Sequence, residues 1–446
     1  MKNILPRTVL LITLLAMPMA RAENLLDIYK LAQENDSTWT AAQANYRANL
    51  EKGAQGRSLL LPVVSANANY SKNTIEGTTT NLITGAVIQG KDEYDITGYG
   101  IQLTQPLFRA ANFAAYAQGK ISVSQADAEL AIARQDLVLR AGQAYFDVLA
   151  AQDALDFARS EKAAIDGQLK LARRNFEVGN ATVVDVHEAQ ARFDLAAAQE
   201  VSADSDLQSK QEALTTLIGR PAGVLARLTS KIGLPKPDPA EPEQWVKAAA
   251  DQNLQIKVQE FLLAIADEEV NKTRGGHYPT LDLVASHGNL DQGGSALGLA
   301  TDYTSNQIGV QLNVPIYQGG YVSSRVREAV ARREQSRDSL TLTKRQTVRQ
   351  TREAFLAVTS GAVRVQALEQ AQVSSQKALE STLIGYESGV RTGVEVLNAQ
   401  RELYRTKRDL SQARYTWLLS RLRLKLAAGT LSEADLGEIN ALLSGV

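Results

Sequence analysis

Two carboxylates stand at the same point of a turn that the sequence contains twice. The segments are GNATVVDVHEAQ at 179–190 and GVRTGVEVLNAQ at 389–400, and they align Asp185 with Glu395. A carboxylate at such a point can cap the N-terminus of a helix, where the macrodipole stabilises negative charge. It can also present a charge at the end of a helical hairpin. The turn by itself leaves both roles open.

Other residue types that support chemistry are scarce. The only histidines are His187, His277 and His287, and none has an acid cluster at metal-ligand spacing. The chain has no cysteine, which excludes disulfides, thiolate metal sites and cysteine nucleophiles. The glycine pairs at 275–276 and 319–320 lack the context of a phosphate loop. We therefore expect no enzymatic activity, no bound metal and no cofactor.

The first 22 residues have the composition of a secretory signal. Lys2 and Arg7 precede a short apolar run, and Ala20-Arg21-Ala22 supplies a cleavage site. The remaining chain has no apolar stretch of the roughly 18 residues that a membrane-spanning helix needs. Removal of the signal lowers the 48 Lys and Arg residues by three, to 45, against 49 Asp and Glu. This balance gives no reason to expect a nucleic-acid partner.

The repeat extends through most of the chain. GRSLLLPVVSANANYS at 56–71 aligns with TRGGHYPTLDLVASHG at 273–288, and GYGIQLTQPLF at 98–108 aligns with QIGVQLNVPIY at 307–317. The segment GLPKPDPAEPEQ between the halves contains four prolines, which identifies a connector. We predict a signal peptide at 1–22, a first structural repeat at 23–232, the connector at 233–244 and a second structural repeat at 245–446.

Each half has the same predicted order of elements. A short helix, at about 24–58 or about 243–273, precedes two strands, which a long helix, a Gly-containing turn and a second long helix follow. No proline occurs from Leu107 to Gly179, and small and large apolar residues recur there at spacings of three and four. At 1.5 Å per residue this helix is about 100 Å long. Taken alone, the helices favour a soluble coiled-coil hairpin.

The strands favour a different interpretation. PVVSANANYS, YGIQLTQ, TLDLVASHG and QIGVQLNVPI alternate apolar residues with uncharged polar ones over about ten positions, the length of a tilted transmembrane strand. Half-buried strands of a soluble sandwich show the same alternation. Two such pairs, each joined by a long polar loop (73–94 and 288–305) and each followed by a long helix, favour the membrane.

Four strands cannot close a barrel, and an open sheet edge is not tolerated in lipid. Eight strands from two chains would leave an interior filled by side chains, whereas twelve strands from three chains leave a lumen. Cyclic symmetry is the common solution for identical chains. We therefore predict a mixed α and β fold, in which a trimeric twelve-stranded transmembrane β-barrel with four strands per chain continues into a long α-helical barrel.

At this point the sequence resembles a known family. LLLPVVSANANYS, IQLTQPLF, FEVGNATVVDVHEAQARFD, HYPTLDLVAS, VPIYQGG and YESGVRTGVEVLNAQRELY together resemble the TolC family of outer-membrane channel proteins over essentially all of 23–446. The resemblance implies a homotrimer in the cell outer membrane with a long periplasmic extension. It implies a passive conduit for tripartite drug efflux, for type I protein secretion or for both. Its implied partners are a periplasmic adaptor and an inner-membrane pump or ABC exporter.

A tube open at both ends would leak, so a closure is expected at the hairpin tips around Gly179 and Gly389. The same tips are the expected contact with the adaptor. Three copies of Glu395 would form an aperture ring that favours cations. Asn398 stands where the resemblance leads us to expect a second aperture acid, which weakens the expected cation selectivity.

The resemblance also implies a lock on the closed aperture, made by a tyrosine–aspartate bond and by an arginine bond to a neighbouring chain. The matching residues are Tyr386, Asp185 and Arg391, the last reaching the Val184 carbonyl. The rival class of protein is a periplasmic adaptor of an efflux system, which would show one helical hairpin within split β domains. This chain shows two helical hairpins and two strand pairs.

Overall fold

The computed structural model describes residues 22–80, 83–229, 233–294 and 300–443. The expected signal peptide at 1–22 lies outside these residues except for Ala22. Contacts divide the chain into two compact units. Unit 1 comprises Met1–Thr40, Arg134–Ala249 and Gln350–Val446, and unit 2 comprises Ala41–Ala133 and Ala250–Arg349. Each unit combines segments from both sequence halves, so the boundaries of the units do not coincide with those of the predicted repeats. The repeats stay a prediction.

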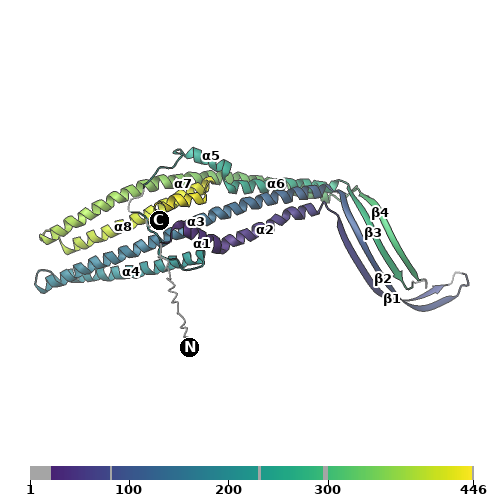
Figure 1. Ribbon diagram of the computed structural model, residues 1–446, viewed down its shortest axis with the longest axis horizontal. Coiled ribbons are helices and arrows are strands. Elements are labelled where there is room, and N and C mark those ends of the chain that lie inside the picture. Colours follow the sequence, from purple (N-terminus) through teal and green to yellow (C-terminus); the bar gives the residue numbers. More distant parts are fainter. Residues whose placement is uncertain (1–21, 81–82, 230–232, 295–299, 444–446) are drawn as a thin grey trace, which may run out of the picture. The chain divides into compact units, whose positions relative to one another are not determined.

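The elements follow one order twice, as Figure 1 shows along the chain. The first half contains α1 (Leu25–Asn35), α2 (Ser37–Ser58), β1 (Val63–Thr80), β2 (Val87–Phe108), α3 (Ala110–Glu177) and α4 (Val183–Ile218). The second half contains α5 (Pro242–Gln252), α6 (Leu254–Arg274), the 3-10 turn η1 (Gly275–His277), β3 (Thr280–Gln292), β4 (Thr301–Asn313), α7 (Tyr321–Glu387), α8 (Gly393–Ala428) and α9 (Glu433–Asn440). The long helices α3 and α7 have 68 and 67 residues, and α4 and α8 have 36 each.

The two short helices expected from the sequence are each broken in two. At the first break, the Asp36 carboxylate accepts a hydrogen bond from the Trp39 backbone N–H at 2.9 Å. It also forms an ion pair with Arg140 at 2.6 Å. At the second, the Asn253 side chain accepts from the N–H groups of Gln255 and Ile256. Asp and Asn compete with the helix backbone in this way, which restarts the helix at each point. The C-terminal helix α9 was not expected.

Unit 2 contains one antiparallel sheet with the order β1-β2-β3-β4. The register places Val64 opposite Leu103, Ala66 opposite Ile101, and Ala285 opposite Ile308. Directly opposed residues share a face, so the apolar sets of the four strands gather on one face and the amides and hydroxyls mainly on the other. Among the described residues, β1 and β4 each pair with a strand on one side only.

The β1–β2 hairpin is longer than the sequence suggested. Residues 73–80 and 87–94, assigned above to a loop, continue the ladder as far as the Thr80–Val87 pair. Cross-strand ion pairs accompany this extension, from Lys72 to Glu93 at 3.3 Å and from Lys91 to Glu76 at 3.2 Å. Threonine suits a strand, but the extension has no apolar alternation from which a strand could be recognised. The β3–β4 hairpin has 13 residues in each strand.

A bidentate ion pair joins the base of the sheet to the start of α3. Arg109, between β2 and α3, donates from Nε and Nη2 to the two carboxylate oxygens of Asp282 on β3, at 2.8 and 2.7 Å. The Asp282 side chain is 10% exposed and that of Arg109 is 39% exposed. A fork of this kind fixes orientation as well as distance, so it holds the direction in which the long helix leaves the sheet.

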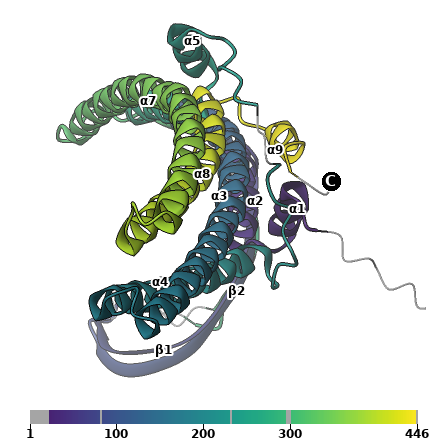
Figure 2. The ribbon, with the colours of Figure 1, turned by 90° about the vertical axis from the view of Figure 1, so that its left-hand side faces the viewer.

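Unit 1 contains the far portions of the two helical hairpins, α3 with α4 and α7 with α8. Figure 2 looks toward the hairpin tips and shows α8 between α7 and α3, with α4 beyond α3. Aromatic side chains contribute to the core of this unit, where the Phe146 ring of α3 contacts both the Tyr145 ring and the Tyr415 ring of α8. The Tyr145 hydroxyl donates to the Ala226 carbonyl at 2.6 Å, which ties the segment after α4 to this core.

The Arg109–Asp282 pair gives a stability prediction. Asp282→Ala is expected to lower the free energy of unfolding by about 2 kcal/mol, because it removes two charge-assisted hydrogen bonds at a mostly buried carboxylate. Urea-induced unfolding of the detergent-solubilised protein measures this change. Glu328→Ala is the matched control, because it breaks the exposed Arg332–Glu328 pair of the same unit and should change stability by less than about 0.5 kcal/mol. Equal effects of the two substitutions would contradict a structural role for the pair.

Candidate functional site

The two hairpin tips have the same backbone geometry. Gly179 and Gly389 both adopt the left-handed region, with φ of 82° and 75°. Just beyond them, the Asn180 N–H donates to the Asn175 carbonyl at 2.7 Å and the Val390 N–H to the Gly385 carbonyl at 2.9 Å. Glycine adopts this conformation without the strain that a side chain would add. The repeated sequence therefore encodes a repeated turn, which closes both long helices identically.

The two repeated carboxylates cap the helices that follow the turns. Asp185 accepts from the backbone N–H of Thr182 at 2.9 Å and from its hydroxyl at 2.7 Å. Glu395 accepts from the same groups of Thr392 at 2.7 and 3.2 Å. In each copy the threonine Oγ1 also accepts a hydrogen bond from the backbone N–H of the acid, which completes a capping box. The capping role considered for the sequence is therefore present at both tips.

Glu395 has a second partner on its own chain. Its other carboxylate oxygen accepts from Nη1 of Arg391 at 2.6 Å. The Thr392 backbone N–H and the Arg391 guanidinium both stabilise the charged form, and they lower the pKa of Glu395 below its ordinary value of 4.5. Both oxygens of this carboxylate are thus occupied within one chain.

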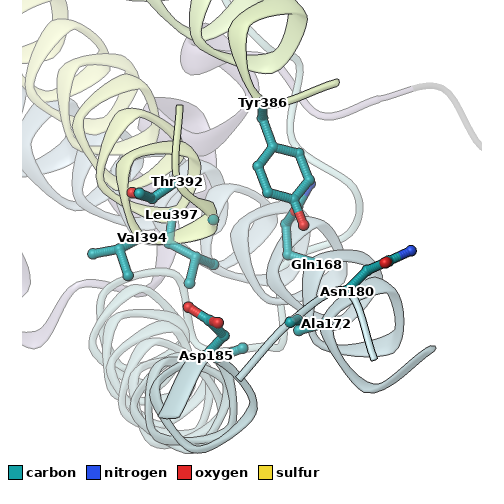
Figure 3. A pocket seen from close by; sticks show the side chains of 11 residues that line it. Gln168, Ala172, Asn180, Asp185, Tyr386, Thr392, Val394 and Leu397 are labelled. Atoms are coloured by element: carbon teal, nitrogen blue, oxygen red, sulfur yellow. The ribbon is translucent and has the colours of Figure 1, made fainter. Parts of the chain in front are cut away.

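A hollow of about 180 Å³ lies between the two hairpin tips. Figure 3 shows Asp185 and Tyr386 on opposite sides of it, with Val394 and Leu397 between them. The Tyr386 hydroxyl accepts from the Asn175 side-chain amide at 3.2 Å. Within the described part of the chain, no hydrogen bond joins Tyr386 to Asp185. Of the predicted lock residues, Asp185 and Tyr386 therefore line one hollow, and each has another partner in the single chain.

Apolar packing fixes α8 against the first hairpin at this level. Leu397 is buried in a cluster with residues of α3 and α4, namely Ile165, Leu169, Ala189 and Ala196. One residue further on, the Asn398 side-chain oxygen accepts from Nη2 of Arg192 on α4 at 3.3 Å. Of the other predicted tip residues, Val184 is exposed on the first turn of α4. Sequence reasoning missed Asn175 and Arg192, whose partners come from another hairpin and leave no signal in local spacing.

The histidines do not join this site. His187 is exposed on α4, and His287 lies on the sheet, where its Nδ1 is 2.6 Å from the Asn306 side-chain oxygen. Over the ranges the structure describes, no cluster of three or more His, Cys, Asp or Glu side chains could hold a metal ion. None of the described helices is both long and apolar enough to cross a membrane.

A known protein family matches this chain in two segments, one in each sequence half. The family model for outer membrane efflux proteins matches residues 28–220 and 245–430. The chain belongs to this family. It is 35% identical to the outer membrane protein TolC of Vibrio cholerae over 94% of each chain. It is 34% identical to the alkaline protease secretion protein AprF of Pseudomonas aeruginosa, over 94% of this chain and 86% of that protein.

Solved structures share the fold at lower identity. The CmeC outer membrane channel of Campylobacter jejuni superposes with a TM-score of 0.78 at 17% identity, covering 94% of this chain and 89% of that one. The outer membrane protein VceC of Vibrio cholerae superposes with a TM-score of 0.74 at 19% identity, covering 91% and 96%.

The family decides the broad function. The protein is an outer-membrane efflux or secretion channel with a long helical periplasmic extension, and its relatives are channel proteins rather than enzymes. The mixed α and β fold expected from the sequence is confirmed. The alternative of a periplasmic adaptor receives no support.

The Glu395 capping box gives a prediction for pH. Because the folded-state pKa of Glu395 is lowered, its contribution to stability is present above its ordinary value of 4.5 and is lost as pH falls through the lower folded-state value. We expect amide hydrogen exchange in the first turn of α8 to lose protection over that acid range. Glu395→Gln should remove this pH dependence, because the amide that replaces the carboxylate does not titrate. Equal pH dependence in the Glu395→Gln variant would contradict the assignment.

Proposed function

We propose that three copies of this chain form a closed conduit, with a twelve-stranded β-barrel in the outer membrane that continues into a periplasmic α-helical barrel. The two sequence repeats, 23–232 and 245–446, would give each copy two equivalent sectors of the wall. The conduit carries out no chemical step and needs no cofactor. It opens and closes at its periplasmic hairpin tips.

The observation that carries this proposal is the open sheet. The outer edges of β1 and β4 present backbone N–H and C=O groups that no described strand satisfies. Such edges are costly in lipid, where water cannot replace the missing partner. Pairing β4 of one copy with β1 of the next removes both edges at once. Three repetitions close a ring with room for a lumen.

The faces of the sheet support the same arrangement. Ile308, Val310 and Leu312 of β4 are 78, 61 and 62% exposed, and they share a face with Val64 of β1 and Ile101 of β2. An apolar face of this kind suits lipid. The opposite face is hollowed and lined mainly by uncharged polar groups, among them Asn67, Gln102 and Ser286. That face suits a water-filled lumen.

The helices leave matching faces uncovered in unit 1. Leu195 and Val201 of α4 are exposed, as are Leu356 and Val363 of α7. Since α8 lies between α7 and the first hairpin, α4 and α7 occupy the two margins of the helical layer (Figure 2). Contact between α4 of one copy and α7 of the next would bury these side chains and extend the closed wall into the periplasm.

The tip residues supply the gate within this proposal. The Tyr386 hydroxyl accepts from Asn175 and keeps its O–H for donation to Asp185 across the hollow. Arg391 uses Nη1 for Glu395, so its other N–H groups can reach the Val184 carbonyl of the neighbouring copy. Glu395 and Asn398 then face the aperture. Opening requires the α7–α8 hairpin to move away from the first hairpin.

The names of the relatives support a proposal about partners and cargo. A relative named for alkaline protease secretion, together with relatives named TolC, suggests a conduit that works with a periplasmic adaptor and an inner-membrane pump or ABC exporter. The exposed tips at Gly179 and Gly389 are the proposed adaptor contact. Drug efflux and type I protein secretion are both compatible with an uncharged polar lumen.

Planar-bilayer recording tests the conduit and its lock together. The purified protein should run as an SDS-resistant trimer and give discrete channel steps. Arg391→Ser combined with Tyr386→Phe should raise the single-channel conductance severalfold, because both bonds that hold the tips inward are lost. Arg332→Ser with Tyr46→Phe is the matched control away from the tips and should leave conductance unchanged. A monomer without channel steps would overturn the conduit, and equal conductance in the tip and control variants would overturn the lock.

A further inference from the structure

The proposed aperture is not lined by free carboxylates. Glu395 is the only acid among the two residues assigned to it, and both of its oxygens already accept hydrogen bonds. Thr392 occupies one oxygen and Arg391 the other, at 2.7 and 2.6 Å. A cation entering the aperture would have to compete with the Arg391 guanidinium, which lies four residues before Glu395 in the turn that precedes α8.

The second aperture residue is neutral and also has a cationic neighbour. The Asn398 side-chain oxygen accepts from Nη2 of Arg192 at 3.3 Å. Among the residues that the structure describes, Arg192 forms an ion pair only with Glu188, a long contact at 3.9 Å, whereas Arg391 contacts Glu395 at 2.6 Å. The Arg192 charge is therefore turned toward α8 and Asn398 by a bond between hairpins. Asp185, across the hollow, is held in its own capping box by Thr182.

We infer that Arg391 and Arg192 set the ion selectivity of this channel. Their positive charges offset the negative charge of the aperture, so the channel discriminates only weakly between cations and anions. This inference rests on the proposed gate at the hairpin tips. A ring of uncompensated carboxylates favours cations because its negative charge attracts cations and repels anions. Here Glu395 has no free oxygen to offer, and the next layer contributes an amide beside a guanidinium.

The two arginines have separable roles. Arg391 also takes part in the proposed lock, so its removal changes conductance and selectivity together. Arg192 bonds only to Asn398 and Glu188 among the contacts described for it. It is therefore a specificity-determining residue, and its substitution should change selectivity while the lock stays in place.

Reversal potentials in a KCl gradient across a planar bilayer test this role. The wild-type channel should show a K⁺ to Cl⁻ permeability ratio within about twofold of unity. Arg192→Gln should raise the ratio about threefold or more toward cations, and Arg192→Gln with Asn398→Asp should raise it further. The conductance of the Arg192→Gln variant should stay close to that of the wild type, because Arg192 takes no part in the proposed lock.

Arg173→Gln is the matched control. Arg173 lies on the first hairpin and, like Arg192, donates to an amide oxygen, that of Gln190 at 2.6 Å. It should leave the permeability ratio unchanged. A strongly cation-selective wild type, or equal ratios in the Arg192→Gln and Arg173→Gln variants, would overturn the inference and leave the conduit standing. The absence of channel steps in every variant would instead overturn the proposed function, and this inference with it.

Discussion

The rest of the structure depends on the unsatisfied hydrogen-bonding groups along two strand edges. β1 and β4 end the sheet on either side, and each has one neighbour among the described strands. The exposed apolar face beside these edges suits lipid, where an unpaired backbone group costs several kcal/mol because water cannot replace its partner. In the proposed trimer, each chain supplies a fraction of the wall and the other copies supply the rest. The long helices follow the strand pairs along the chain, and in this proposal they continue the same wall.

In the proposed gate, the tips combine two functions that usually conflict. A helix N-terminus is stabilised by a carboxylate, and a narrow aperture is destabilised by several of them. The Glu395 carboxylate has a partner in the turn just before α8, the Arg391 guanidinium, while the Thr392 capping box is retained. Next to the hollow, the Asn175 side chain donates to the Tyr386 hydroxyl at 3.2 Å, a long bond between two neutral groups. The proposed gate, which must open in response to a partner, requires contacts of this modest strength.

The sequence predicted the elements whose patterns are local. Periodicity located the long helices, alternation located the faces of the strands, and the repeated turn around Gly179 and Gly389 predicted matching tips. The extension of the β1–β2 ladder was missed because its polar residues, 73–80 and 87–94, show no apolar alternation. The breaks at Asp36 and Asn253 were missed because a capping residue inside a helical pattern differs little from a surface one. Asn175 and Arg192 were missed because their partners are set by how one hairpin packs on another.

Cross-linking of the two sheet edges tests the shared wall most directly. The chain has no cysteine, so a pair introduced on β1 and β4 can react only with itself. Gln307→Cys on β4 would be combined in turn with Ser65→Cys, Asn67→Cys or Asn69→Cys on β1, all on the polar face, and oxidised in outer membranes. The account predicts that at least one pair gives covalent dimers and trimers, and that either single cysteine alone gives no trimer. Exclusively monomeric products from every pair, in a protein that is folded and membrane-inserted, would contradict it.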